Sequence, residues 1–272
     1  MKNTLKEFIP PIALKMIRRL SWKQTGDRLK PDWHTIQSGH LKGINIYVNN
    51  EMPAFKEMIA GKYDGFLWKY LDDISFEKSI VLDIGAHIGY HSMGFANKGG
   101  NVIAFEPNPY NVERLKKNLS RNERLKERIS IMPVAVSDVN EEVKFCFSKN
   151  IDDETSTGGY IENSYKPLQD TEYEKAGFTC QNIQAKQLDK FVEENNYENI
   201  RVIKIDVEGA EHLVLAGALK TLKKYSPKLF IEIHSVTSML FVTQILSRLD
   251  YHIKIIKEDT VSRCFIMAEK TL

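Results

Sequence analysis

The sequence predicts an open α/β sheet of the doubly wound kind, and three observations predict it. Apolar runs alternate with helical segments, as in a sheet whose strands are covered by helices on both faces. The main runs are continuously apolar, which is typical of buried parallel strands. Each run ends in acidic or polar residues, and the carboxyl edge of such a sheet is where these folds bind ligands. We therefore expect a cleft beside Asp83, Glu106, Asp206, Glu232 and His234.

The first strand of this sheet covers Val81 to Ile84 and runs into a turn that carries two glycines, Gly85 and Gly89, before a helix near Tyr90. Glycine lets a ligand approach the backbone closely, because it has no Cβ atom. The pattern Asp-x-Gly-x-His-x-Gly differs from the dinucleotide fingerprint Gly-x-Gly-x-x-Gly, which brings a helix N-terminus to a pyrophosphate. An acid at the strand tip disfavours an anion and favours a cationic ligand such as S-adenosylmethionine. The sequence therefore points to a methyl donor as the cofactor.

A second strand, residues 101–106, ends in Glu106, which lies 21 positions beyond Gly85. This is close to the spacing of about 20 residues expected for an acid that holds ribose hydroxyls in a doubly wound sheet. Pro107 and Pro109 end the strand, and Asn108 or Asn111 is placed to add a polar contact before a helix over about 110–122. The two acids are therefore expected to bracket one nucleoside.

Further elements follow the same alternation. A half-buried strand is expected over 43–48 and a helical stretch over 53–71, and both are expected to cover the cofactor edge. A third strand over 129–135 leads into Val136, where small residues could face an adenine. Residues 148–178 are rich in polar residues and are expected to form a long loop, either a cap on the site or a plain surface excursion.

The segment from Ile200 to Glu211 contains the second group of chemically active residues. It predicts a buried strand to Asp206, a turn at Gly209 and a helix through about residue 224, with acids near the helix start. Lys204 needs a charged partner if it is buried, and Asp206 or a neighbouring strand-end acid is the expected one. Two interpretations of Asp206 stay open: an orienting ion pair, or a position beside the transferred methyl group.

The strand over 227–234 places Glu232 and His234 on one side, and His234 is the preferred candidate for a general base because of its intrinsic pKa. A metal site is an alternative, because Asp206, Glu208, Glu232 and His234 could supply a mixed shell for Mg²⁺ or another divalent ion. A partner for Lys204, a helix start and a base explain the same residues, so no metal is the preferred expectation. His87 and His91 are expected to make local hydrogen bonds.

Length and composition agree with a single enzyme domain. The chain has 272 residues, of which 42% are hydrophobic and 27% charged, and its net charge of +2 gives no reason to expect nucleic acid as a partner. Cys146, Cys180 and Cys264 are far apart and odd in number, which argues against a disulfide framework or a zinc site. We expect three structural thiols and a cytoplasmic location.

Residues 1–30 differ from the rest of the chain, because eight lysines and arginines stand there against two acids. An apolar stripe over 11–20 predicts an amphipathic helix that is too short to span a bilayer. Two interpretations stay open. The helix packs on the domain or on a second subunit, or it is a basic anchor at the inner, anionic face of a membrane. The oligomeric state is left open.

Five segments together carry a resemblance to a known family. They are Val81–Tyr90, Phe105–Pro109, Leu188–Asp189, Lys204–Glu211 and Ile231–His234. In this combination the chain resembles the FkbM family of S-adenosylmethionine-dependent methyltransferases, and Lys-Ile-Asp-Val-Glu-Gly-Ala-Glu is its most specific mark. The similarity runs from about residue 63 to 272, so we expect an N-terminal basic helix and cover segment over 1–62 and the methyltransferase domain over 63–272.

The resemblance implies a class I methyltransferase fold, a Rossmann-like sheet of seven mostly parallel strands with an antiparallel C-terminal hairpin. It also implies O-methylation of a hydroxyl on a sugar of a polysaccharide or glycolipid. His87 departs from the Asn or Gly common in that turn, which leaves its role open. Two other functions stay open: a non-catalytic nucleotide-binding or assembly module, and an NAD-dependent sugar-modifying enzyme.

Motifs and resemblance together give the candidate site. Catalytic roles are expected for Asp206, His234 and Glu232. Contacts to S-adenosylmethionine are expected at Asp83, Gly85, Ala86, His87, Gly89, Tyr90, Glu106, Asn108, Ala135, Val136 and Asp206.

Overall fold

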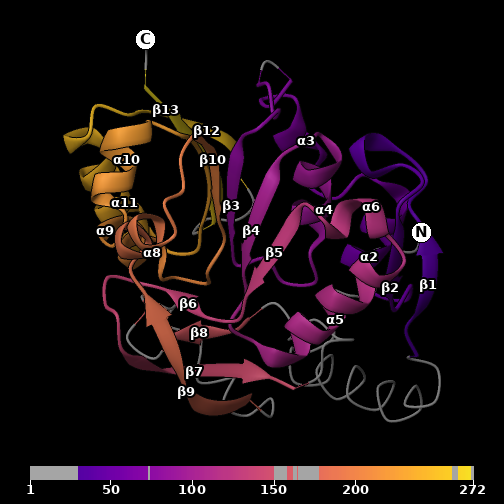
Figure 1. Cartoon of the computed structure of the whole chain (residues 1–272). Helices are drawn as coiled ribbons and strands as arrows, with labels where there is room; N and C mark the ends of the chain where they lie inside the picture. Colours follow the sequence, from indigo (N-terminus) through magenta and orange to yellow (C-terminus); the bar gives the residue numbers. More distant parts are fainter. Residues whose placement is uncertain are drawn as a thin grey trace, which may run out of the picture.

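A computed structural model describes residues 30–72, 74–149, 158–161, 164, 178–258 and 263–270 of the chain. Its centre is a seven-stranded sheet in the order β12-β13-β11-β10-β3-β4-β5 (Figure 1). The strands are β3 (Ile80–Ile84), β4 (Asn101–Phe105), β5 (Ile129–Met132), β10 (Ile200–Ile205), β11 (Lys228–Ile233), β12 (His252–Glu258) and β13 (Cys264–Glu269).

The strand directions confirm the predicted doubly wound sheet of the class I methyltransferase type. The strands β5, β4, β3, β10 and β11 are parallel to one another. Strand β13 runs antiparallel to both β11 and β12, which confirms the predicted C-terminal hairpin. The chain winds in one direction from β3 to β5 and in the other from β10 onward, so the switch point lies between β3 and β10. Folds of this kind bind ligands at the carboxyl edge beside that point.

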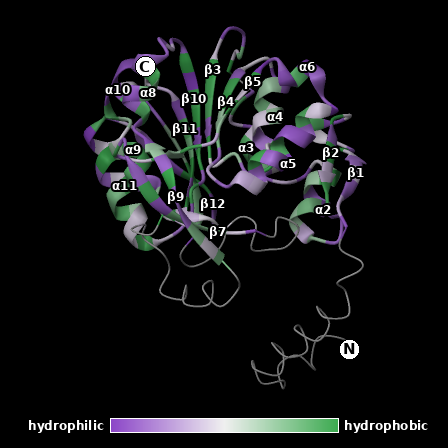
Figure 2. Ribbon diagram, turned by 60° about the horizontal axis from the view of Figure 1, so that its bottom comes forward, coloured by the Kyte–Doolittle hydropathy of each residue, from purple (hydrophilic) through white to green (hydrophobic). Residues whose placement is uncertain are grey.

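Helices cover both faces of the sheet, as the two layers in Figure 2 show. One layer holds α3 (Gly65–Trp68), α4 (Tyr90–Asn97), α5 (Pro109–Ser120) and α6 (Glu123–Lys126), and the other holds α8 (Leu188–Glu194), α9 (Glu211–Ala216), α10 (Leu219–Tyr225) and α11 (Val236–Arg248). The side chains of neighbouring residues in one strand pack against different helix layers. Val81 joins the apolar cluster of the first layer and Leu82 that of the second. Burial on both faces explains why the strand is apolar throughout.

The described part of the N-terminal segment forms a hairpin and a short helical stretch. Its elements are β1 (Asp32–Thr35), the 3₁₀ helix η2 (Gly39–Leu41), β2 (Asn45–Val48) and α2 (Pro53–Ala60). The hairpin packs on α5, because the backbone N–H of Tyr47 donates to the side-chain oxygen of Asn118 at 2.7 Å. Among the described residues before β3, only Met58 and Tyr63 line the pocket at the carboxyl edge of the sheet, so the predicted cover over this edge is small. A domain boundary near residue 62 stays a prediction, and the predicted helix over 11–20 lies outside the described residues.

A second, four-stranded sheet of order β6-β9-β7-β8 lies beside the carboxyl edge of the main sheet (Figure 1). Its strands are β6 (Ala135–Val136), β7 (Glu142–Ser148), β8 (Tyr160–Ile161) and β9 (Phe178–Lys186). Cys146 on β7 and Cys180 on β9 face each other in register and form a disulfide. The prediction of three structural thiols is therefore wrong, and Cys264 is the one free cysteine. Most of the predicted loop over 148–178 lies outside the described residues.

Two predicted elements are interrupted for identifiable reasons. The single helix expected after Gly209 is split into α9 and α10 at Gly217, where a Cβ atom would lie 2.1 Å from the carbonyl oxygen of Ser137. The strand expected over 129–135 is split into β5 and β6 around Pro133, which has no N–H for a strand ladder. None of the helices in the described ranges is both long and apolar enough to cross a membrane.

Candidate active site

A pocket opens at the carboxyl ends of β3, β4, β10 and β11. Most of the predicted site residues line it: Gly85, Ala86, His87, Tyr90, Glu106, Asn108, Ala135, Val136, Asp206 and Glu232. Further lining comes from Met58, Tyr63, Ile84, His91, Phe105, Pro107, Asn111, Val134, Phe145, Gly159, Ile161, Lys204, Val207, Glu208, Ala210 and Arg263. Three predicted residues, Asp83, Gly89 and His234, lie outside this lining.

The turn after β3 has the backbone conformation that glycine permits. Gly85 has a φ of +80°, and a Cβ atom there would lie 1.8 Å from the carbonyl oxygen of Asp206. Gly89 has a φ of +87° and precedes α4, and a Cβ atom there would lie 2.8 Å from Leu115 Cγ. The turn is therefore pressed against β10 on one side and α5 on the other. Any side chain at Gly85 would push β3 and β10 apart at the pocket.

His87 sits in the same turn in the left-handed region, with a φ of +51°. Its backbone N–H donates to Glu106 Oε2 at 2.7 Å, so the turn is tied to the end of β4. The imidazole stacks on Phe55 with ring centroids 6.5 Å apart. Burial lowers the pKa of His87 to about 4, and the ring is neutral at pH 7.

Asp83 lies behind the pocket wall. Its carboxylate is fully buried, and Ser92 donates its hydroxyl hydrogen to Oδ2. Its Oδ1 lies 3.5 Å from Lys204 Nζ. Asp83 therefore acts on the pocket through Lys204, and a direct contact with a nucleoside stays a prediction.

Glu106 follows β4 and presents a carboxylate to the pocket. Its Oε1 accepts from the backbone N–H of Asn108 at 2.9 Å and from Asn111 Nδ2 at 3.1 Å. Burial raises the pKa of Glu106 to about 7, although these hydrogen bonds and the one from His87 act in the opposite direction. The carboxylate is thus held in one orientation and close to its protonation midpoint at neutral pH.

Asn108 begins α5 rather than offering a free amide. Its side-chain oxygen accepts from the backbone N–H of Tyr110 at 3.0 Å, the usual role of an N-cap residue. Its amide nitrogen donates to the carbonyl oxygen of Ser148 at 3.3 Å. Beside it, Ala135 and Val136 on β6 and Phe145 on β7 form an apolar wall of the pocket. This end of the pocket suits a flat, apolar ring.

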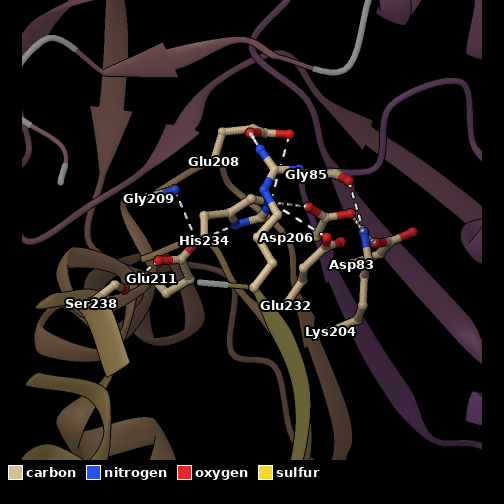
Figure 3. A network of polar contacts seen from close by, with 11 residues as sticks. Asp83, Gly85, Lys204, Asp206, Glu208, Gly209, Glu211, Glu232, His234 and Ser238 are labelled. Carbon is tan, nitrogen blue, oxygen red and sulfur yellow. Dashed lines mark hydrogen bonds and ion pairs between the residues drawn. The ribbon is translucent and has the colours of Figure 1, made fainter. Parts of the chain in front are cut away.

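Lys204 connects the turn after β3 with the acids at the opposite end of the pocket (Figure 3). Its Nζ donates to the carbonyl oxygen of Gly85 at 3.0 Å and to Asp206 Oδ2 at 3.2 Å. The expected partner of Lys204 is confirmed, and Asp83 is a second one. Burial opposes the charge of Lys204, but Asp206 and Asp83 outweigh burial and raise its pKa. Lys204 is therefore a permanently charged link between β3 and β10.

His234 is buried at the end of β11 and faces four acids (Figure 3). Its Nδ1 lies 2.7 Å from Glu211 Oε1. Its Nε2 lies 3.6 Å from Glu208 Oε1, 3.6 Å from Glu232 Oε1 and 3.7 Å from Asp206 Oδ1. Burial opposes protonation, but Glu208 and Glu211 outweigh it and raise the pKa of His234 to about 10.

The pKa values of the acids around His234 are shifted in opposite directions. Burial would raise the pKa of Asp206, yet Lys204 and His234 outweigh burial and lower it to about 2. Burial, followed by repulsion from Asp206, raises the pKa of Glu232 to about 9. Such divergent pKa values in one cleft are typical of active sites.

The sequence profile of the family described as "Methyltransferase FkbM domain" matches residues 83–253. This chain belongs to the FkbM methyltransferase family. The matched range holds the end of β3 and all of β4, β10 and β11, with both the turn after β3 and the acids around His234.

Two curated relatives share part of this FkbM-family chain. The 2-O-methyltransferase NoeI of Sinorhizobium fredii is 30% identical over 150 residues, which are 53% of this chain and 59% of that protein. The hexuronic acid methyltransferase AglP of Haloferax volcanii is 28% identical over 174 residues, which are 63% of this chain and 62% of that protein. The matches span about three fifths of the length of each relative.

Solved structures agree on the fold. The crystal structure of methyltransferase FkbM from Methylobacillus flagellatus KT superposes with a TM-score of 0.50 at 23% identity, covering 72% of this chain and 45% of that one. At this identity the similarity bears on the fold alone.

Tyr63 and Arg263 are among the pocket side chains that sequence reasoning missed. Tyr63 follows α2 and packs edge-on against Tyr90, with ring centroids 5.6 Å apart. Arg263 precedes β13, and its Nη2 lies 3.5 Å from Glu208 Oε2. Neither residue belongs to a strand end of the parallel sheet, so the rule that located the acids could not find them. His91, expected to make local contacts, pairs with Asp64 at 3.3 Å.

Proposed function

We propose that this chain is an S-adenosylmethionine-dependent O-methyltransferase that acts on a hydroxyl of a sugar in a polysaccharide or glycolipid. One observation carries the proposal: a single pocket at the switch point of the sheet has Glu106 at one end and Asp206 and Glu232 at the other. Membership of the FkbM family supports methyl transfer, and the similarity to the hexuronic acid methyltransferase AglP supports a sugar acceptor.

The residues of the donor end fit S-adenosylmethionine, which supplies a methyl group on a positively charged sulfur. Gly85 leaves the backbone bare where the ligand would approach. Glu106 would accept hydrogen bonds from the ribose hydroxyls, and Ala135 and Val136 would flank the adenine. The acids beyond Lys204 favour a cationic sulfur over a pyrophosphate, which argues against a nicotinamide dinucleotide.

At the acceptor end, Asp206 is the residue best placed to take the proton of the acceptor hydroxyl. Its side chain is 27% exposed to the pocket and ionised at neutral pH. Glu232 would hydrogen-bond a neighbouring hydroxyl of the sugar. His234 is buried behind both carboxylates and would act as a positioning residue, because its raised pKa keeps it from accepting a proton.

Binding and transfer can be tested separately. We expect S-adenosylhomocysteine, and not NAD, to raise the melting temperature. We also expect labelled methyl groups to appear in a glycan pool by mass spectrometry, and Asp206→Asn to reduce transfer at least about tenfold without abolishing S-adenosylhomocysteine binding. Stabilisation by NAD alone would overturn the proposal. Binding of S-adenosylhomocysteine with no transfer to any acceptor would favour a non-catalytic nucleotide-binding module.

A further inference from the structure

His234 Nε2 is a buried nitrogen that makes no hydrogen bond, although it points into a group of carboxylates. The residue is 1% exposed, and Nε2 lies 3.7 Å from Asp206 Oδ1 and 3.6 Å from Glu232 Oε1. One ligand atom from each of these three residues lies within 4.8 Å of the other two. A buried polar atom without a hydrogen bond is uncommon and calls for an occupant that the protein itself does not supply.

The separations between Nε2 and the two carboxylate oxygens are wide enough for the three side chains to share one metal ion. Hydrogen bonds between nitrogen and oxygen span about 2.7–3.2 Å, so gaps of 3.6–3.7 Å are too long for them. Metal ions hold nitrogen and carboxylate oxygen at about 2.0–2.2 Å. Two ligands at that radius lie about 3.0 Å apart at a right angle and about 3.6 Å apart at 120°. The observed gaps therefore leave room for an ion between the three side chains.

The other ring nitrogen of His234, Nδ1, has a carboxylate partner, as in metal-binding histidines. A ligating imidazole usually donates its other N–H to a carboxylate, which fixes the ring and leaves the remaining nitrogen free for the metal. Here Nδ1 meets Glu211 Oε1 at 2.7 Å. Glu211 is itself fully buried, accepts from the backbone N–H of Gly209 at 2.9 Å, and accepts from the hydroxyl of Ser238. The support behind His234 is thus complete and aims Nε2 at the pocket (Figure 3).

The charge balance also favours a cation. Asp206, Glu208, Glu211 and Glu232 all lie within 4.0 Å of His234, with side chains no more than 27% exposed. Lys204 stands at one side of this group and Arg263 at the other, beside Glu208. Buried carboxylates in such number need a positive charge between them. Protonated His234 supplies one such charge, and a divalent cation would displace that proton from Nε2 and take its place.

We propose that Asp206, Glu232 and His234 bind one divalent cation of the kind that accepts both nitrogen and oxygen ligands, such as Mn²⁺ or Zn²⁺. Glu208 is placed to be a fourth ligand, since its Oε1 lies 3.6 Å from Nε2. The preference expected from sequence, for no metal, is reversed by the geometry around Nε2. A role for the ion in lowering the pKa of an acceptor hydroxyl rests on the proposed function. Binding of the ion by these residues does not depend on the proposed function.

The test measures ion binding directly. Protein treated with EDTA and freed of chelator is titrated with MnCl₂ by calorimetry, and free Mn²⁺ is followed by electron paramagnetic resonance. We expect one ion per chain, with affinity reduced more than about tenfold by Glu232→Gln and by His234→Gln. Asp72→Asn is the control, because it removes a carboxylate that pairs with Lys98 at 3.3 Å outside the pocket lining, and it should leave Mn²⁺ affinity unchanged.

S-adenosylhomocysteine binding by each variant separates loss of the site from loss of the fold. If Glu232→Gln or His234→Gln binds S-adenosylhomocysteine as the wild type does, and yet binds Mn²⁺ just as tightly, the metal proposal is overturned. Wild-type protein that binds neither Mn²⁺ nor Zn²⁺ at about 1 mM also overturns it. Wild-type protein that binds one Mn²⁺ through these residues, but transfers no methyl group, supports the metal site and counts against the proposed function alone.

Discussion

Replacing Gly85 by alanine should damage both the fold and the pocket, and Gly43 offers a matched control. The φ angles are +80° and +86°, so each alanine carries a similar left-handed penalty of about 1–2 kcal/mol. A Cβ atom at Gly43 meets nothing within 4 Å, whereas at Gly85 it would lie 1.8 Å from the carbonyl oxygen of Asp206. Relieving that overlap means moving β10 away from β3, at a cost of about 1–3 kcal/mol more.

Urea unfolding measures the two costs side by side. We expect Gly85→Ala to lower the free energy of unfolding by about 2–5 kcal/mol and Gly43→Ala by about 1–2 kcal/mol. By calorimetry, we expect Gly85→Ala to weaken S-adenosylhomocysteine binding at least about tenfold, because the displaced turn forms part of the proposed donor site. Equal destabilisation by the two alanines would refute the close packing of the turn against Asp206. Unchanged S-adenosylhomocysteine affinity would refute the placement of the donor there.

Three further predictions follow from single contacts. The pKa of Glu106 is raised to about 7, and ribose hydroxyls would bind its ionised form. The affinity for S-adenosylhomocysteine should therefore rise with pH through about 7 and level off above it. Calorimetry from pH 6 to 9 measures this rise, which Glu106→Gln should remove. The disulfide between Cys146 and Cys180 spans 34 positions, so its reduction should destabilise the fold by about 4 kcal/mol on an entropic basis, measured by urea unfolding with and without reductant. Lys204→Met leaves Asp83 buried without a cation and should cost about 3–5 kcal/mol in the same assay.

Each of these predictions has a contrary outcome. A pH-independent affinity in the wild type would mean that Glu106 does not hold the ribose. Three free thiols in the denatured, unreduced protein would contradict the disulfide. If Lys204→Met unfolded at the same urea concentration as the wild type, the carboxylate of Asp83 could not depend on Lys204 for its charge balance.

The parts of the structure that sequence predicts well are those in which local pattern and burial agree. Continuous apolar residues identify β3 and β4 because both faces of these strands are covered. The acids after each strand are found for the same reason, since parallel strands bring their carboxyl ends to one edge. Gly85 is found because its turn requires a positive φ.

What sequence misses depends on contacts between distant segments. Asp83 looks identical in sequence to a ligand-binding acid, and only the positions of Ser92 and Lys204 reveal that it is turned away from the pocket. The disulfide requires the register of β7 against β9, which the spacing of the cysteines does not give. The orientation of His234 is set by Glu211, a residue that local pattern assigns to a helix start.

A crystal structure of the complex with S-adenosylhomocysteine tests the central claim most directly. The account predicts the ribose hydroxyls on the carboxylate of Glu106, the adenine against Ala135 and Val136, and the sulfur facing Asp206. A nucleoside bound elsewhere on the molecule, or one whose ribose leaves Glu106 without a contact, would contradict it.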